Sequence, residues 1–109
     1  MARYLFLESR DPFESRDGDF VADHAVALKK RGHQVTVFLL QNGTLAARKA
    51  ALGTPLGRLI EAGVNLLADD FSLLERGISE NDCLPGVRVS NMDALVDLLM
   101  QAQCKAIWH

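Results

Sequence analysis

Two adjacent carboxylates, Asp69 and Asp70, are the residues whose types and position most clearly suggest chemistry. They follow the apolar run 64–68 and precede a short helical pattern over 71–76. Carboxylates at the end of a strand can bind a metal ion or transfer protons. Asp is equally favoured at a helix N-terminus, where it accepts backbone hydrogen bonds. The pair therefore predicts either a helix cap or a small-molecule or metal-binding module.

The two cysteines, Cys83 and Cys104, are the other candidates for chemistry. Their spacing matches no zinc motif, and two are too few for a disulfide scaffold, so a reducing cytoplasm is expected. A thiol becomes nucleophilic when a cation or a helix N-terminus lowers its pKa. Cys104 opens an expected strand, whereas Cys83 lies in the expected polar loop 78–86. Cys83 is the better placed of the two for sulfur transfer, although Asp82 beside it would raise its pKa.

The three histidines and the glycines predict no cofactor. His24 falls within an apolar helical stripe and is expected to be a core or interface residue, while His33 is expected to be solvated in a turn. None of the histidines, including His109, has an identifiable second metal ligand, so no metal is predicted. The segment after the first strand lacks the glycine fingerprint of a dinucleotide-binding site.

Composition and charge further limit the classes of protein to which this chain can belong. The chain has 109 residues, a net charge of −2, and 49% hydrophobic against 24% charged residues. These values predict one globular domain spanning residues 1–109. The charge offers no broad attraction for nucleic acid. No uncharged apolar run approaches the roughly 18 residues that would span a membrane. Neither nucleic acid nor membrane is expected as a partner.

Short strand-like segments alternate with helical ones along the chain. Strands are expected at 3–7, 34–40, 64–68, 87–89 and 104–109. Helices are expected at 19–31, at 45–52 with Thr44 as N-cap, at 56–62, at 71–76, and after Ser90, with Ser90 as N-cap and Asp93 completing a capping box. This order predicts an α/β fold, a three-layer α/β/α sandwich with a five-stranded, mostly parallel sheet.

Ligands of such sheets collect at the carboxyl ends of the strands. The segments expected there are 8–19, 41–44, 69–70 and 90–91, with the tail residues 108 and 109 near the same edge. Within them, the predicted binding residues are Asn42, Gly43, Asp69 and Asp70.

Apolar residues and glycines also recur in a familiar order. A helix ends at Gly32 before the strand VTVF, a glycine follows in the turn, a later helix closes with RGI, and LPGVRV precedes the helix DALVDLL. Over nearly the whole chain this pattern resembles the DsrE/DsrF/DsrH family of sulfur-relay proteins, which includes the Tus proteins of tRNA thiolation. The resemblance implies the same sandwich fold and homo- or hetero-oligomers, often trimers or hexamers, with other sulfur-relay proteins as partners.

In that family, active members carry a persulfidable cysteine about eight residues before the glycine of the RGI motif. Here this position is Asp69, and a carboxylate cannot hold a persulfide. The resemblance therefore implies a DsrE-like protein of intracellular sulfur metabolism that is a non-carrying or diverged subunit. Two alternatives stay open at this stage: a binding module using Asp69 and Asp70, and a sulfurtransferase acting through Cys83.

Overall fold

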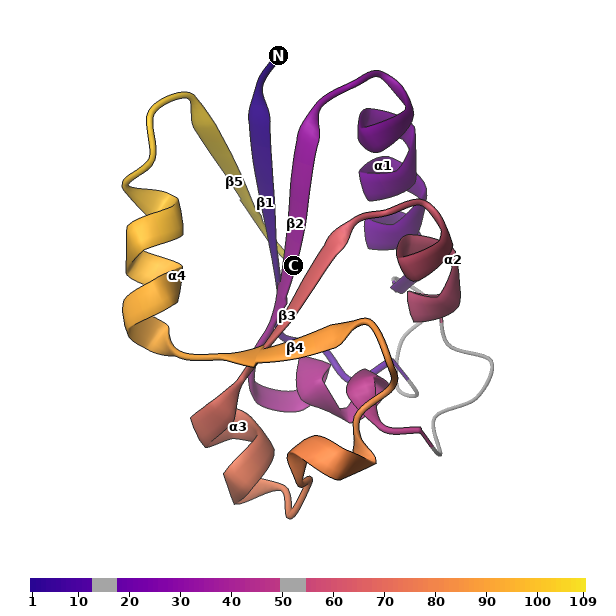
Figure 1. Cartoon of the computed structure of the whole chain (residues 1–109), viewed down its shortest axis with the longest axis vertical. Coiled ribbons are helices and arrows are strands. Elements are labelled where there is room, and N and C mark those ends of the chain that lie inside the picture. The colour runs from indigo at the N-terminus through magenta and orange to yellow at the C-terminus, as the bar shows by residue number, and fades with distance from the viewer. Residues whose placement is uncertain (13–17, 50–54) are drawn as a thin grey trace.

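A computed structural model describes residues 1–12, 18–49 and 55–109. Its centre is a sheet of five strands in the order β4-β3-β2-β1-β5, and every neighbouring pair is parallel. The strands are β1 (Arg3–Glu8), β2 (Gln34–Leu39), β3 (Asn65–Asp69), β4 (Val87–Ser90) and β5 (Cys104–Trp108). The predicted five-stranded sheet is confirmed, with parallel pairing throughout (Figure 1).

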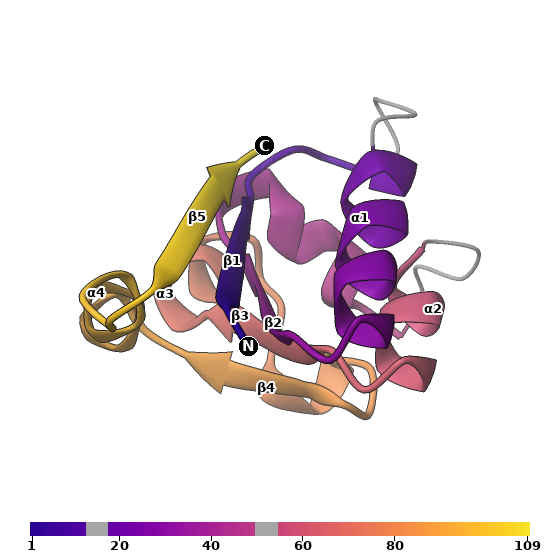
Figure 2. The same cartoon turned by 90° about the horizontal axis from the view of Figure 1, so that it is seen from above.

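Helices cover both faces of the sheet. One face is covered by α1 (Gly18–Lys30) and α2 (Leu56–Glu61), and the other by α4 (Met92–Leu99), as Figure 2 shows. At the carboxyl ends of the strands lie α3 (Asp70–Glu75) and two 3-10 helices, η1 (Gln41–Ala47) and η2 (Glu80–Asp82). The three-layer prediction is thereby confirmed. Within the described residues, no helix is long and apolar enough to cross a membrane.

The alternation of side chains along each strand separates two apolar cores. Phe6, Val37 and Leu66 belong to the core beneath α1 and α2. Leu5, Phe38 and Leu67 belong to the core beneath α4. Continuing the same alternation, Glu8 at the end of β1 faces the α1–α2 side, and Asp69 at the end of β3 faces the α4 side.

The helix predicted over 45–52 is wrong over its described residues. A 3-10 helix begins earlier, at Gln41, and Thr44 lies inside it with its hydroxyl donating to the Gln41 carbonyl at 2.7 Å. The backbone has already become extended at Arg48, and residues 50–52 lie outside the described part. The reason lies at Gly43, where an added Cβ would be 2.1 Å from the Glu8 carbonyl oxygen. The chain must turn tightly against β1 before a regular helix can begin.

Two further predictions need correction. Ser90 ends β4 instead of capping α4, and Asn91 is the N-cap, with its side chain accepting a bond from the Ala94 N–H at 2.9 Å. His24 is exposed, so it is not a core residue, and its role at an interface stays a prediction. Its ring packs 4.2 Å from the Phe20 ring, and its Nδ1 lies 2.7 Å from the Phe20 carbonyl oxygen. The apolar stripe of α1 is therefore narrower than its sequence indicates.

Candidate functional site

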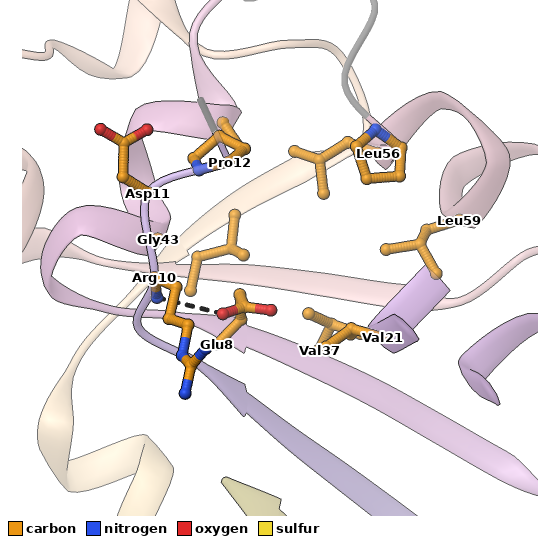
Figure 3. Close-up of a pocket in the computed structure, with 12 residues that line it drawn as sticks. Glu8, Arg10, Asp11, Pro12, Val21, Val37, Gly43, Leu56 and Leu59 are labelled. Atoms are coloured by element: carbon orange, nitrogen blue, oxygen red, sulfur yellow. Dashed lines mark hydrogen bonds between the residues drawn. The ribbon is translucent and has the colours of Figure 1, made fainter. Parts of the chain in front are cut away.

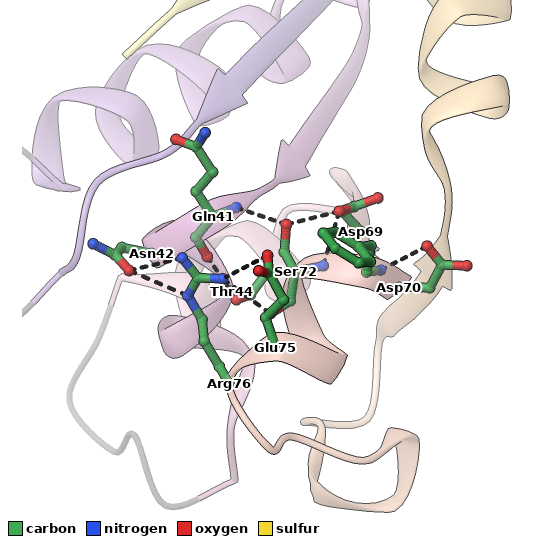
Figure 4. Close-up of polar contacts among 9 residues, drawn as sticks. Gln41, Asn42, Thr44, Asp69, Asp70, Ser72, Glu75 and Arg76 are labelled. Carbon is green, nitrogen blue, oxygen red and sulfur yellow. Dashed lines mark hydrogen bonds and ion pairs between the residues drawn. The ribbon is translucent and has the colours of Figure 1, made fainter.

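Asp69 is buried where β3 passes into α3, with only 2% of its surface exposed. Its Oδ2 accepts two hydrogen bonds from Ser72, from the backbone N–H at 3.0 Å and from the hydroxyl at 2.7 Å. Its Oδ1 is equally buried and has no hydrogen-bond partner among the described residues. Asp69 is thus the N-cap of α3, and half of its carboxylate is left unsatisfied (Figure 4).

Ser72 connects this carboxylate to the turn after β2. The Gln41 N–H donates to the Ser72 hydroxyl oxygen at 2.9 Å, and that hydroxyl donates onward to Asp69. Gln41 has a φ of 50°, in the left-handed region that a non-glycine residue seldom adopts. The resulting chain of bonds fixes η1 beside α3 and gives Asp69 the role of an acceptor.

Asn42 and Gly43, both predicted binding residues, are used structurally in the same region. The Asn42 Oδ1 accepts bonds from the Arg76 Nε at 3.1 Å and Nη2 at 3.0 Å. Arg76 also donates from Nη1 to the Ser72 carbonyl at 3.1 Å. Gly43 is buried against the backbone of Glu8. The structure therefore places Asn42 and Asp69 in one polar network, with Ser72 and Arg76 as the links that the sequence did not suggest.

Asp70, the second predicted carboxylate, does not join Asp69. It is exposed, and its Oδ1 accepts a bond from the adjacent Phe71 N–H at 2.6 Å. No group of three or more His, Cys, Asp or Glu side chains that could hold a metal occurs within residues 1–12, 18–49 and 55–109. The adjacent pair in the sequence thus becomes one buried cap and one exposed side chain.

A second buried carboxylate, Glu8, ends β1 at the same edge of the sheet. Its Oε1 and Oε2 lie 3.0 Å and 2.9 Å from the His109 Nδ1, and Oε1 accepts a further bond from the Arg10 N–H at 3.0 Å. The His109 ring stacks against Phe20 of α1 with the centroids 5.6 Å apart. This pair joins the ends of β1 and β5 on the α1–α2 side. The sequence predicted that both residues lie at the carboxyl ends of the strands, but it did not predict that they contact each other.

Cys83 is buried beside η1, not presented by a solvated loop. Its backbone forms an isolated antiparallel bridge with Arg48, and its thiol lies 3.7 Å from the Ser79 carbonyl oxygen. Burial, together with the negative charges of Asp82 and Glu80, raises the pKa of the Cys83 thiol above its ordinary value. A raised pKa lowers the thiolate fraction, and the thiolate is the nucleophilic form.

Cys104 lies at the other end of the strands from Asp69. It begins β5 in register with Arg3, at the amino ends of the strands, and packs against the core beneath α4. The carboxyl edge, where Asp69 and Glu8 lie, is one full strand length away. The structure therefore places neither described cysteine at the end of β3.

The sheet has five parallel strands between two helical layers, and polar residues lie at the carboxyl ends of the strands. This arrangement defines the α/β sandwich class, in which ligands bind at the carboxyl ends of the strands. The profile of the DsrE/DsrF-like family matches residues 2–105, and the chain belongs to this family. A search of curated proteins gave no match.

Three solved structures share the fold. The YchN protein of Escherichia coli superposes with a TM-score of 0.88 at 17% identity, each chain being covered completely. MTH1491 of Methanobacterium thermoautotrophicum gives 0.83 at 19% identity, also with complete coverage of both chains. BT1422 of Bacteroides thetaiotaomicron gives 0.73 at 18% identity, over 96% of this chain and 94% of that one. At these identities the likeness concerns the fold.

Proposed function

We propose that this chain is a cytoplasmic DsrE-like subunit of a sulfur relay that does not itself carry sulfur. The observation that carries the proposal is Asp69, which stands at the end of β3 where the family resemblance places the sulfur-carrying cysteine. Its carboxylate is buried and committed to Ser72. Family membership supports the relay context, and the chemistry of the side chain supports the absence of carriage.

Sulfur carriage requires an exposed thiolate. The thiolate attacks the outer sulfur of a donor persulfide, a new S–S bond forms, the donor's S–S bond breaks, and the donor leaves as a thiolate. A carboxylate cannot form the stable S–S bond of this step. Of the cysteines, Cys83 is buried with a raised pKa, and Cys104 lies at the other edge of the sheet. Neither arrangement favours the exchange.

A persulfide trap tests this proposal. The full chain is incubated with a low-molecular-weight persulfide donor, alkylated, digested and mapped by mass spectrometry, alongside Cys83→Ser and Cys104→Ser. We expect no more persulfide on either cysteine than on the same peptides from unfolded protein. Stoichiometric persulfide on Cys83, lost in Cys83→Ser, would replace the proposal with the sulfurtransferase alternative.

We also propose that the chain works as an oligomer, either with itself or with other relay subunits. Met92, Val96 and Leu99 recur at helical spacing on α4 and are 43%, 55% and 42% exposed. Trp108 at the end of β5, on the same side of the sheet, is 63% exposed. Apolar residues gathered on one face of a protein are typical of an interface. The α4 side, which Asp69 also faces, is the surface that a partner subunit would cover.

Light scattering coupled to size exclusion tests the oligomer directly. We expect the wild type at micromolar concentration to have a mass above that of one chain, and Val96→Glu to lower it. Asp97→Ala is the matched control, because Asp97 is an exposed polar residue on the same helix. A monomeric wild type, alone and when mixed with relay proteins of its host, would contradict this part of the proposal.

A further inference from the structure

A polar cleft opens at the amino ends of the strands, on the side of the sheet that α4 covers. Arg3 begins β1 in register with Gln34 of β2 and Cys104 of β5, and Leu5 belongs to the core beneath α4. Side chains two apart on a strand face the same side, so Arg3 lies on this face beyond the apolar core. In Figure 1 the turn after α4 leads into β5 beside the start of β1. The polar side chains that line the cleft are those of Arg3, Gln34, Thr36, Asn65, Gln101 and Cys104.

Arg3 carries the only formal charge among the described residues that line this cleft. Its Nε donates to the Gln34 Oε1 at 3.0 Å, and its Nη1 donates to the Ala102 carbonyl at 2.9 Å. Both acceptors are neutral, and no carboxylate in the described part of the chain forms an ion pair with Arg3. The two bonds hold the guanidinium in place and leave its Nη2 without an acceptor among the same residues. The cleft therefore has a positive charge that no acidic group neutralises, with N–H donors in a fixed orientation.

The cleft is also large enough for a small molecule. Its water-accessible volume is about 100 Å³. One water needs roughly 10–15 Å³ by this measure, so a molecule of several non-hydrogen atoms fits. The cleft at the carboxyl ends of β1 and β2 is different: its volume is about 30 Å³, and the carboxylate of Glu8 that borders it is paired with His109 (Figure 3). The polar cleft therefore combines room for a ligand with an unpaired charge.

The other polar groups of this cleft are a hydroxyl and side-chain amides. Thr36 is 8% exposed, and its Oγ1 accepts a long bond from the Asn65 Nδ2 at 3.4 Å. The hydroxyl hydrogen of Thr36 has no acceptor among the described residues. The Asn65 Oδ1 accepts a bond from the Arg88 Nη2 at 2.8 Å, which orients the amide and brings a second cation near the cleft. These groups form hydrogen bonds without adding negative charge, so they suit the hydroxyl groups of an anionic ligand.

We propose that this cleft binds a compact hydroxycarboxylate, with its carboxylate accepting from the Arg3 guanidinium and its hydroxyl groups bonded to Thr36 and Asn65. An anion is favoured because Arg3 has no acidic partner, and a carboxylate matches the planar geometry of a guanidinium. Hydroxyl groups are favoured over a hydrocarbon chain because the polar groups of the lining need hydrogen-bond partners when water is displaced. The site does not depend on the relay role, since Arg3 and Asp69 lie at opposite ends of the strands.

Glycerate is a suitable probe, with glycerol and propionate as molecules of similar size that lack its charge or its hydroxyl groups. Titration of the full chain, followed by two-dimensional NMR, is expected to show saturable shifts for glycerate at residues of the cleft, and weaker binding of the other two. Arg3→Gln keeps a hydrogen-bonding side chain and removes the charge, and we expect it to weaken binding of glycerate about tenfold to a hundredfold. Arg31→Gln, at an exposed arginine that follows α1, is the matched control and should leave binding unchanged.

Cys104 provides a readout that needs no change at Arg3, because its thiol lines the cleft and is partly exposed. In Cys83→Ser, saturating glycerate should slow the alkylation of Cys104 by iodoacetamide, and the same concentration of glycerol should not. Thr36→Val keeps the shape of the side chain and the charge of Arg3, and we expect it to weaken binding about threefold to tenfold.

No saturable binding of glycerate to the wild type, or an unchanged rate of alkylation, would overturn the proposal. Glycerol bound as tightly as glycerate would show that charge has no role, and propionate bound as tightly would show that the hydroxyl groups have none. Either result would overturn the proposal as well.

Discussion

Glu8 and Asp69 end two parallel strands of the same sheet, and both are buried, yet they are held in different ways. Both oxygens of Glu8 face His109, and one also accepts the Arg10 N–H, on the α1–α2 side. Asp69 uses one oxygen for Ser72 and leaves the other without a partner among the described residues, on the α4 side.

The difference follows from what comes next in the chain. A helix begins directly after Asp69, so its carboxylate accepts the Ser72 N–H, one of the free N–H groups of that helix's first turn. No helix begins directly after Glu8, so, apart from the Arg10 N–H, its carboxylate is held by His109, the residue that follows the distant strand β5. Two carboxylates that each end a strand therefore have different uses: Asp69 has a local structural bond, and Glu8 remains oriented toward a cleft.

The largest expected effect is that of Gly43→Ala, which displaces the backbone of Glu8. The added Cβ would meet the Glu8 carbonyl oxygen at 2.1 Å, so β1 and η1 must separate. We expect a loss of about 2–3 kcal/mol in the free energy of unfolding, measured in urea. Gly57→Ala is the control, because nothing lies within 4 Å of its added Cβ. A Gly43→Ala protein as stable as the control would show that the close approach is not required.

Asp69→Ala is expected to have the next largest effect. It removes the cap of α3 and leaves the Ser72 N–H without its acceptor, which costs about 1–2 kcal/mol. Asp69→Asn keeps an acceptor for Ser72 and removes the buried charge, so it should cost less than Asp69→Ala. Chemical unfolding of the three proteins measures both differences. An unchanged stability of Asp69→Ala would mean that the cap is not the principal role of this residue.

The Glu8–His109 contact should show a smaller coupling. A double-mutant cycle with Glu8→Gln and His109→Gln compares the two single variants with the double variant, and we expect a coupling of about 1 kcal/mol. The side chains of both residues are mostly buried, which limits screening by salt. Strictly additive effects would mean that the pair does not stabilise the joining of β1 and β5.

The smallest effect concerns the thiol of Cys83. Because the pKa of Cys83 is raised, its alkylation at neutral pH should be slower than that of an unfolded peptide. The rate should continue to rise at pH values above the ordinary thiol pKa, where the rate of the unfolded peptide has levelled off. Glu80→Gln removes one of the charges that raise this pKa and should modestly increase the rate. Measurement in a Cys104→Ser background isolates Cys83. Alkylation as fast as in the unfolded peptide would contradict the burial of this thiol.

Much of the fold could be predicted because its signals are local. The strand over Gln34–Leu39 is apolar on both faces, as an interior strand must be, and it lies at the centre of the sheet. The helix after Asp69 was predicted from its cap and from Gly77, whose φ of 67° suits a helix end. The 3-10 helix at Gln41–Ala47 was not predicted, because it depends on the tertiary contact of Gly43 with Glu8.

The site was less predictable for the same reason. Asp69 could be singled out from its position after a strand, but the link from Gln41 through Ser72 joins residues about thirty apart in the chain. The pairing of Glu8 with His109 spans nearly the entire sequence. Only the expected order of strands could have suggested it, because β5 pairs with β1 and brings their ends together.

The most direct test of the central claim is to measure the intact mass of the wild type, native and unfolded in urea, after exposure to a persulfide donor. The unfolded protein exposes Cys83 and Cys104 and is the control for the donor. We predict that the native protein gains no more reducible sulfur than the unfolded protein, because Asp69 is a carboxylate, Cys83 is buried with a raised pKa, and Cys104 lies at the other end of the strands. One sulfur atom per native chain, above the level of the unfolded protein and removed by a thiol reductant, would contradict the account that this chain does not itself carry sulfur.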